Sequence, residues 1–182
     1  MQSYDYSQRK GVEEISWERF AQLTKTLAEK LADAKIEVIV GIARAGLFPA
    51  TAVACALRCE LYPVRVTRRM YDEVIFKHPI WKVGMSLEVE GRIVAVVDEI
   101  ADTGETLALV AERARELGAT RVITASLISH SWAKPMPEIV ALVTDAFVIF
   151  PWDKYIYQNG QWQFHPESTE ALNLQHENAL RS

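Results

Sequence analysis

The residues best suited to chemistry lie in one short segment near the middle of the chain. Residues 94–107 read VAVVDEIADTGETL, an apolar run that ends in two adjacent carboxylates, Asp98 and Glu99. Two apolar residues later, Asp-Thr-Gly-Glu-Thr (102–106) opens a candidate helix. A Thr-Gly-x-Thr turn before a helix offers backbone N–H groups and two hydroxyls, a combination that suits a terminal phosphate. The neighbouring carboxylates could accept hydrogen bonds from a sugar or hold a chelated metal ion.

The same residues have a structural interpretation, which must be weighed. Asp102 or Thr103 could simply cap the helix, and Asp98 with Glu99 could lie on a surface turn. Capping accounts for one polar residue, but not for the whole run directly after a buried strand. We therefore favour a phosphate site. The chain has neither GxGxxG after a strand nor GxxxxGK[ST], so the common nucleotide-binding motifs are absent.

The elements around this segment are predicted from their hydrophobic patterns. Residues 92–98 form the strongest strand candidate, and the helix that starts near Thr103 has an apolar face and ends at Gly118. Pro63 restricts the strand predicted over 61–67 to an edge or a strand start. The other expected elements are a helix after Ser16, strands at 36–42 and 121–129, a helix over 46–58, and the apolar runs EIVALVTD and FVIF.

Strands that alternate with helices predict an α/β fold, a mostly parallel twisted sheet with helices on both faces. Residues 68–84 lack periodicity and predict a long loop or loose hairpin, of the kind that often serves as a lid. No run after Trp152 is strong enough to extend the sheet. We expect a single domain over residues 1–182, with a core at about 34–150 and a small accessory hood formed by the N-terminal segment and about 151–182.

Composition limits the class of protein. The chain has 182 residues, of which 49% are apolar and 24% charged, which suits one globular domain. A net charge of −4 argues against a nucleic-acid partner. No apolar run approaches the ~20 residues that span a bilayer, and the N-terminus is polar, so we expect a cytoplasmic protein without a membrane partner.

The central segment resembles a known signature. VVDEIADTGET is similar to the phosphoribosyl-pyrophosphate (PRPP) motif of type I phosphoribosyltransferases, with Glu99 in place of the usual second Asp. The resemblance extends over roughly 36–153. GIARAGLFPA resembles the pyrophosphate loop, residues 67–83 take the place of the catalytic lid, and FVIFPWD is similar to the purine-contacting segment of the xanthine-guanine and hypoxanthine branch.

This resemblance implies the type I phosphoribosyltransferase fold and a Mg²⁺-dependent enzyme of purine salvage. Such an enzyme moves the phosphoribosyl group from PRPP to a purine base, here expected to be a 6-oxopurine, and releases pyrophosphate and a nucleoside monophosphate. The alternatives are a phosphoribosyltransferase for another base and a non-catalytic, PRPP-sensing regulator. The family also suggests a homodimer or homotetramer.

Roles at the PRPP site follow by resemblance, residue by residue. Asp98 and Glu99 would hold the ribose hydroxyls and, with Asp153, the metal ion. Asp102 is implied as the catalytic residue, the general base near N7 of the purine. The residues implied in PRPP binding are Asp98, Glu99, Ala101, Asp102, Thr103, Gly104, Glu105 and Thr106.

The resemblance also implies sites for pyrophosphate and base. Pyrophosphate would contact Ala43, Arg44, Ala45 and Gly46 together with Arg68 and Arg69 of the lid, with Lys77 as a further candidate. A non-proline cis peptide is implied at Ala43–Arg44.

For the base, Phe147 would stack on the purine and the backbone of Val148 would face its edge. His130 stands where the branch usually carries a Lys that donates to O6, and Lys134 follows four residues later. Arg44 could instead be a solvated surface residue, Phe147 a core residue and His130 a structural histidine.

Overall fold

The structure is a computed structural model that describes residues 9–70 and 73–181. The first eight residues of the expected hood and residues 71–72 of the expected lid lie outside the described residues. The chain divides into two compact units. One comprises Gln22–Thr144, and the other comprises the described parts of Gln2–Ala21 and Asp145–Ser182.

A mixed sheet forms the centre of the first unit. Among the described residues it has six strands in the order β6-β3-β2-β7-β8-β9. All neighbours pair in parallel except β3 and β6, which are antiparallel. The predicted mostly parallel sheet is therefore confirmed. The strands are β2 (Val38–Ile42), β3 (Glu60–Thr67), β6 (Ile80–Val83), β7 (Ile93–Ala101), β8 (Arg121–Ser129) and β9 (Ile139–Val143).

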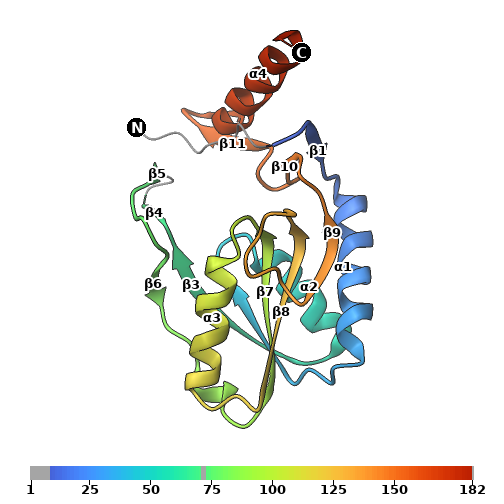
Figure 1. The fold of residues 1–182 in the computed structure, drawn as a ribbon, viewed down its shortest axis with the longest axis vertical. Helices are drawn as coiled ribbons and strands as arrows, with labels where there is room; N and C mark the ends of the chain where they lie inside the picture. Colours follow the sequence, from blue (N-terminus) through green and yellow to red (C-terminus); the bar gives the residue numbers. More distant parts are fainter. Residues whose placement is uncertain (1–8, 71–72, 182) are drawn as a thin grey trace. The chain divides into compact units, whose positions relative to one another are not determined.

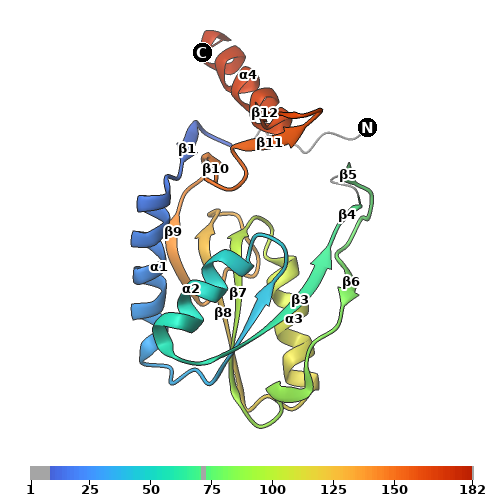
Figure 2. The ribbon, with the colours of Figure 1, turned by 180° about the vertical axis from the view of Figure 1, so that it is seen from behind.

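Helices cover both faces of this sheet. In Figure 1, α3 (Glu105–Glu116) lies in front of the strands, whereas in Figure 2 α2 (Leu47–Leu57) lies in front. α3 presents a buried apolar stripe that includes Leu107 and Val110. The helix α1 (Trp17–Ala32) has residues in both units, and a short 3₁₀ turn covers Leu87–Val89.

The continuous apolar runs are explained by burial on both faces. The four residues of β7 from Val94 to Val97 are fully buried, as are Ile39 and Val40 of β2. A strand between two helical layers has no solvated face, so it shows no polar alternation. Each buried Val or Ile side chain contributes roughly 1.5–3 kcal/mol of transfer free energy, which anchors the strand ends that bear the polar residues.

One part of the predicted pattern needs correction. The segment from 68 to 84, expected to be a long loop or loose hairpin, contains the antiparallel pair β4 (Arg69–Met70) and β5 (Glu73–Val74), as a hairpin would, but also β6, which joins the main sheet. β6 was missed because it is a four-residue edge strand that pairs only with the end of β3. Pro63 precedes that pairing and has a neighbour only in β2, which agrees with its expected edge position.

The second unit contains two small sheets and a helix. β1 (Val12–Glu14) pairs in parallel with β10 (Phe147–Ile149), and β11 (Tyr155–Gln158) pairs with β12 (Gln161–Phe164) in a hairpin. The helix α4 (Pro166–Arg181) follows. The hairpin and α4 were not predicted, although Asn159-Gly160, both with positive φ, is a strong hairpin signal in the sequence. Within the described residues, no helix is both long and apolar enough to span a membrane.

Candidate active site

The chemistry-bearing residues of the first unit follow the carboxyl ends of parallel strands. β2, β7, β8 and β9 run in the same direction, so the loops that leave them lie at one edge of the sheet. These loops are residues 43–46 after β2, 102–104 after β7 and 130–138 after β8. Parallel α/β sheets bind their ligands at this edge.

Asp98 and the loop after β2 lie in direct contact. A Cβ on Gly46 would lie 2.6 Å from Oδ1 of Asp98 and 2.5 Å from the carbonyl oxygen of Ile42, so only glycine allows this approach. The same Oδ1 accepts the backbone N–H of Glu99 at 3.0 Å. The expected pyrophosphate loop and the first acidic residue are therefore adjacent.

Asp98 has an unusual electrostatic environment. Asp98 is only 8% exposed, whereas Glu99 is half-buried. Burial, and then the negative charge of Glu99, raise the pKa of Asp98 well above its usual range. A cation or a set of hydroxyl donors at this point would offset both effects. The pair of oxygen ligands also suits a hard divalent ion.

The cis peptide expected between Ala43 and Arg44 is present, which confirms that prediction. The backbone N–H of Ala43 donates to the carbonyl of Val64 in β3 at 2.7 Å, which ties the start of the loop to the sheet. Arg44 is exposed.

The turn after β7 leads directly into α3. Gly104 is the N-cap residue, with φ of +87°, and as a glycine it has no side chain with which to cap the helix. The hydroxyl of Thr103 accepts the backbone N–H of Glu105 at 3.4 Å, so part of the capping interpretation is also correct. The helix therefore starts at Glu105 rather than near Thr103, and the first turn of α3 presents its N–H groups at the sheet edge.

The loop after β8 runs alongside this turn. The backbone N–H of His130 donates to the carbonyl of Ala101 at 3.1 Å, and that of Lys134 donates to the carbonyl of Thr103 at 2.8 Å. A Cβ on Gly104 would lie 2.2 Å from the carbonyl oxygen of Pro135, so the two backbones are in close contact. The backbone of Lys134 lies beside the candidate phosphate turn, and its side chain is exposed.

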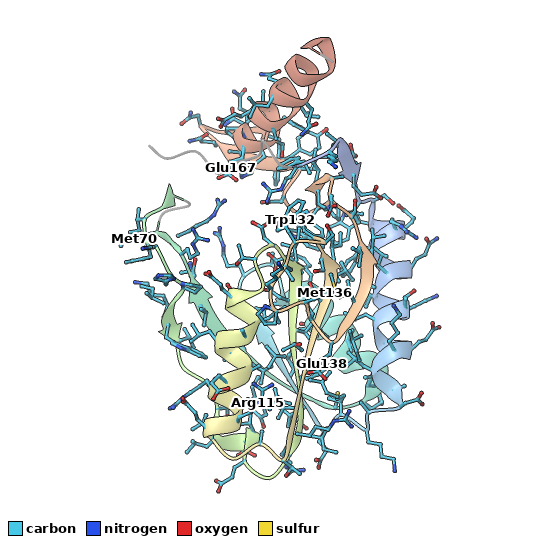
Figure 3. The ribbon with its side chains drawn as sticks, viewed as in Figure 1. Met70, Arg115, Trp132, Met136, Glu138 and Glu167 are labelled. Carbon is cyan, nitrogen blue, oxygen red and sulfur yellow. The ribbon has the colours of Figure 1, made fainter. Side chains whose placement is uncertain are left out.

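Trp132 is a residue of the site that sequence reasoning missed. Its Nε1 donates to Oδ1 of Asp102 at 3.2 Å. Figure 3 shows Trp132 at the end of the sheet where β7 and β8 terminate. The available signal was its place directly after the strand predicted over 121–129, which is the next expected strand after the PRPP-like segment.

The side chain of His130 is fully buried, which favours the interpretation as a structural histidine, and its expected contact with a base stays a prediction. Its Nδ1 lies 2.6 Å from the carbonyl oxygen of Thr144. A carbonyl only accepts, so Nδ1 carries the hydrogen. The ring stacks on Trp132 with centroids 4.4 Å apart and planes 19° apart, and Nε2 lies 3.9 Å from Oδ1 of Asp102.

The basic residues expected in the lid lie at the β4–β5 hairpin. Arg68 donates from Nε to the carbonyl of Phe76 at 3.5 Å, and its own carbonyl accepts two backbone N–H groups. The N–H of Arg69 donates to the hydroxyl of Thr67 at 3.0 Å. Lys77 is exposed. These contacts order the hairpin locally, and the roles expected for the three basic side chains stay predictions.

The remaining predicted residues belong to the second unit. In β10, Phe147 pairs with Val12 and Val148 with Glu13 of β1, and both side chains are half-buried. Oδ1 of Asp153 lies 4.0 Å from Nε2 of His165, and the Asp153 side chain is 68% exposed. Their roles toward a base and a metal ion stay predictions.

A mostly parallel sheet with carboxylates and a helix N-terminus at its carboxyl edge defines an α/β protein whose sheet edge is suited to a phosphorylated ligand. Residues 12–159 match the phosphoribosyl transferase domain family, and the chain belongs to that family. This result confirms the resemblance to type I phosphoribosyltransferases and the fold expected from it.

Individual relatives agree with this assignment. A xanthine-guanine phosphoribosyltransferase of Nitratidesulfovibrio vulgaris (strain Hildenborough) is 28% identical over 146 residues, 78% of this chain and 85% of that protein. A purine phosphoribosyltransferase from Pyrococcus horikoshii has a TM-score of 0.71 at 28% identity, covering 81% of this chain and 98% of that one. A Neisseria gonorrhoeae protein solved with bound ppGpp has a TM-score of 0.69 at 21% identity, with 93% and 98% covered, which supports the fold alone.

Proposed function

We propose that the protein is a PRPP-dependent pentosyltransferase of purine salvage, with a 6-oxopurine as acceptor. The observation that carries this proposal is the shared sheet edge of the Asp98-Glu99 pair and the Thr103–Thr106 turn at the N-terminus of α3. The names of the Nitratidesulfovibrio vulgaris and Pyrococcus horikoshii relatives support a purine as the base.

The turn into α3 binds the 5′-phosphate in this proposal. Thr103, Gly104, Glu105 and Thr106 supply backbone N–H groups and two hydroxyls, and the positive end of the helix dipole favours the anion. Ala101 ends the buried strand β7, and its carbonyl accepts the backbone N–H of His130, which fixes the point where the turn begins. Because a side chain on Gly104 would collide with Pro135, the turn and the β8 loop form one support for the phosphate.

Asp98 and Glu99 accept the ribose hydroxyls, and the loop 43–46 receives the pyrophosphate. The contact of Gly46 with Asp98 supports this arrangement, because it brings the two subsites next to each other. Arg44, with Arg68 and Arg69 from the lid, supplies positive charge where the leaving group develops negative charge.

Mg²⁺ fits the donor set at this point. Asp98 and Glu99 offer adjacent oxygen ligands. A cation would offset the unfavourable effects of burial and of the Glu99 charge on the Asp98 carboxylate, which together raise its pKa. Mg²⁺ usually takes one or two carboxylates and completes its shell with water and substrate oxygens, and Asp153 is a further candidate. When bound, it would neutralise charge on the pyrophosphate.

Asp102 acts as the general base. A nitrogen of the purine attacks C1′ of PRPP, the bond from C1′ to the pyrophosphate oxygen breaks, and Asp102 receives the proton that the purine loses. Its carboxylate lies beside the candidate phosphate turn and contacts Trp132 of the β8 loop, which supports a role next to the phosphoribosyl group.

Base recognition is assigned differently from the first expectation. The ring of His130 is fully buried, whereas Lys134 has an exposed side chain and a backbone N–H that donates to the carbonyl of Thr103 in the phosphate turn. We therefore assign donation to O6 to Lys134. Phe147 remains the candidate for stacking and Val148 for the base edge.

The decisive experiment follows pyrophosphate release from PRPP and Mg²⁺ with hypoxanthine, guanine, xanthine, adenine, uracil or orotate. Turnover should be highest with a 6-oxopurine. Asp102→Asn should keep PRPP affinity but lower turnover by roughly 10²–10⁴-fold, the usual contribution of a positioned acid–base group. PRPP binding without turnover of any base would favour a sensing regulator, and a preference for orotate or uracil would replace the purine. A cytoplasmic homodimer or homotetramer remains our expectation for the assembly.

A further inference from the structure

The loop after β8 makes a side-chain contact with Asp102 that family membership does not explain. Nε1 of Trp132 donates to Oδ1 of Asp102 at 3.2 Å, and the Asp102 side chain is 21% exposed. An indole N–H is only a donor, and it complements the negative charge of a carboxylate while it restricts its rotation. The general base of the proposed reaction is thus held by a residue from another strand end.

The indole is itself held in place by the buried ring of His130. The two rings stack with 4.4 Å between centroids. His130 cannot turn away easily, because its side chain is fully buried and its Nδ1 donates to the carbonyl of Thr144 at 2.6 Å.

The backbone reinforces the arrangement on both sides of Asp102. His130 donates to the carbonyl of Ala101, the residue before Asp102, and Lys134 donates to that of Thr103, the residue after it. Trp132 lies between these two anchors in the β8 loop. Three contacts therefore fix the loop against three consecutive residues, of which Ala101 ends β7 and Asp102 and Thr103 follow it.

We propose that Trp132 is the positioning residue of this enzyme, which orients the Asp102 carboxylate for proton transfer. The inference rests on the proposed function, since the role of Asp102 belongs to it. A carboxylate on a single Cβ can rotate, and a general base works only within hydrogen-bond reach of the proton that it removes. A displacement of about 1 Å in such a group lowers rates by up to roughly 10²-fold.

A double-mutant cycle tests the proposal. Trp132→Phe removes the N–H and keeps an aromatic ring against His130. It should lower kcat by roughly 10- to 100-fold, the effect of losing one hydrogen bond to a charged group, and leave KM for PRPP within about twofold. In the Asp102→Asn background the same substitution should change kcat by less than about twofold, because the group on which it acts is already disabled.

The control is Trp162→Phe, a side chain that is 71% exposed on β12. It should leave kcat and KM unchanged. If Trp132→Phe left kcat unchanged, or lowered it by the same factor with and without Asp102, the indole would have only a structural role and the proposal would fail.

A spectroscopic measurement decides the contact without any turnover. In ¹H–¹⁵N spectra of the whole protein, one indole N–H signal should move in Asp102→Asn, and that signal should be the one missing in Trp132→Phe. This comparison needs only wild type and Asp102→Asn if Trp132→Phe does not fold. If no purine were a substrate, the proposed function would fail separately. Indole signals that do not move in Asp102→Asn would overturn the inference in either case.

Discussion

A single side chain can determine which base the site accepts, and the two candidates for the donor to O6 of the purine are Lys134 and His130. Lys134 is exposed beside the phosphate turn, whereas His130 is buried behind Trp132. A donor to O6 favours hypoxanthine, guanine and xanthine over adenine, because the 6-amino group of adenine does not accept in the same way.

Lys134→Met should therefore lower kcat/KM for the three 6-oxopurines by roughly 10- to 100-fold and change it much less for adenine. The range corresponds to the loss of about 1.5–3 kcal/mol of hydrogen bonding to a charged donor. Lys25→Met, an exposed residue on α1, is the matched control. An equal loss for all four bases would show that Lys134 does not read position 6.

The buried carboxylate of Asp98 makes stability depend on pH. Its pKa is raised by burial and by Glu99, so the folded protein holds this proton more tightly than the unfolded chain does. The stabilisation is present below the usual pKa of Asp, about 3.9, and is lost as the pH rises through the raised value.

Asp98→Asn should consequently gain Tm relative to wild type as the pH rises from about 4 toward neutrality, in protein free of Mg²⁺ and PRPP. Each 1 kcal/mol should appear as roughly 2–4 °C in a chain of this size. Thermal unfolding at several pH values measures the difference, with the exposed Asp33→Asn as control. A constant Tm difference across this pH range would contradict the prediction.

At the level of elements, the junction of β7 and α3 tolerates no side chain at Gly104. Its φ is +87°, and an added Cβ would approach the carbonyl oxygen of Pro135 to 2.2 Å. Either feature alone is unfavourable, and backbone cannot move aside as a flexible side chain can.

Gly104→Ala should lower the free energy of unfolding by about 2–4 kcal/mol and weaken PRPP binding, since the turn must separate from the β8 loop. Gly84→Ala is the control, because nothing lies within 4 Å of its added Cβ. Denaturant unfolding and PRPP titration provide the measurements. Wild-type values for Gly104→Ala would mean that the two loops are not in close contact.

The elements also show what local sequence reveals and what it does not. β2, β7 and β8 were predictable because burial on both faces leaves long apolar runs. β1 and β6 have three or four residues and depend on partner strands elsewhere in the chain, so no local pattern marks them, whereas the apolar run FVIF marked β10. The Asp102–Trp132 contact joins residues on two different loops and follows only from strand order.

Across the whole molecule, local stability should be unevenly distributed. The backbone of β7 and β8 is paired on both sides and almost fully buried. The β11–β12 hairpin is a two-stranded sheet, and the side chains of Tyr157 and Trp162 on it are 64% and 71% exposed. Backbone amides in an exposed two-stranded hairpin of this kind can open locally without global unfolding.

Hydrogen exchange followed by mass spectrometry should find peptides of β7 and β8 protected longest and peptides of β11 and β12 exchanged early. The physical reason is that opening the central strands requires loss of the main core, whereas opening the hairpin exposes little apolar surface. Comparable protection of the hairpin and β7 would show that the hairpin is stabilised as strongly as the core.

The parallel pairing of β1 with β10 has a consequence for biosynthesis. β1 is translated before the strands of the main sheet, but its partner Phe147–Ile149 is translated only after them. The N-terminal strand must therefore wait, with an unpaired edge, while the rest of that sheet is translated. Closing so long a loop is slow compared with local pairing. A chaperone that binds extended segments on nascent chains would therefore have a target at Val12–Glu14 until residue 149 has been translated.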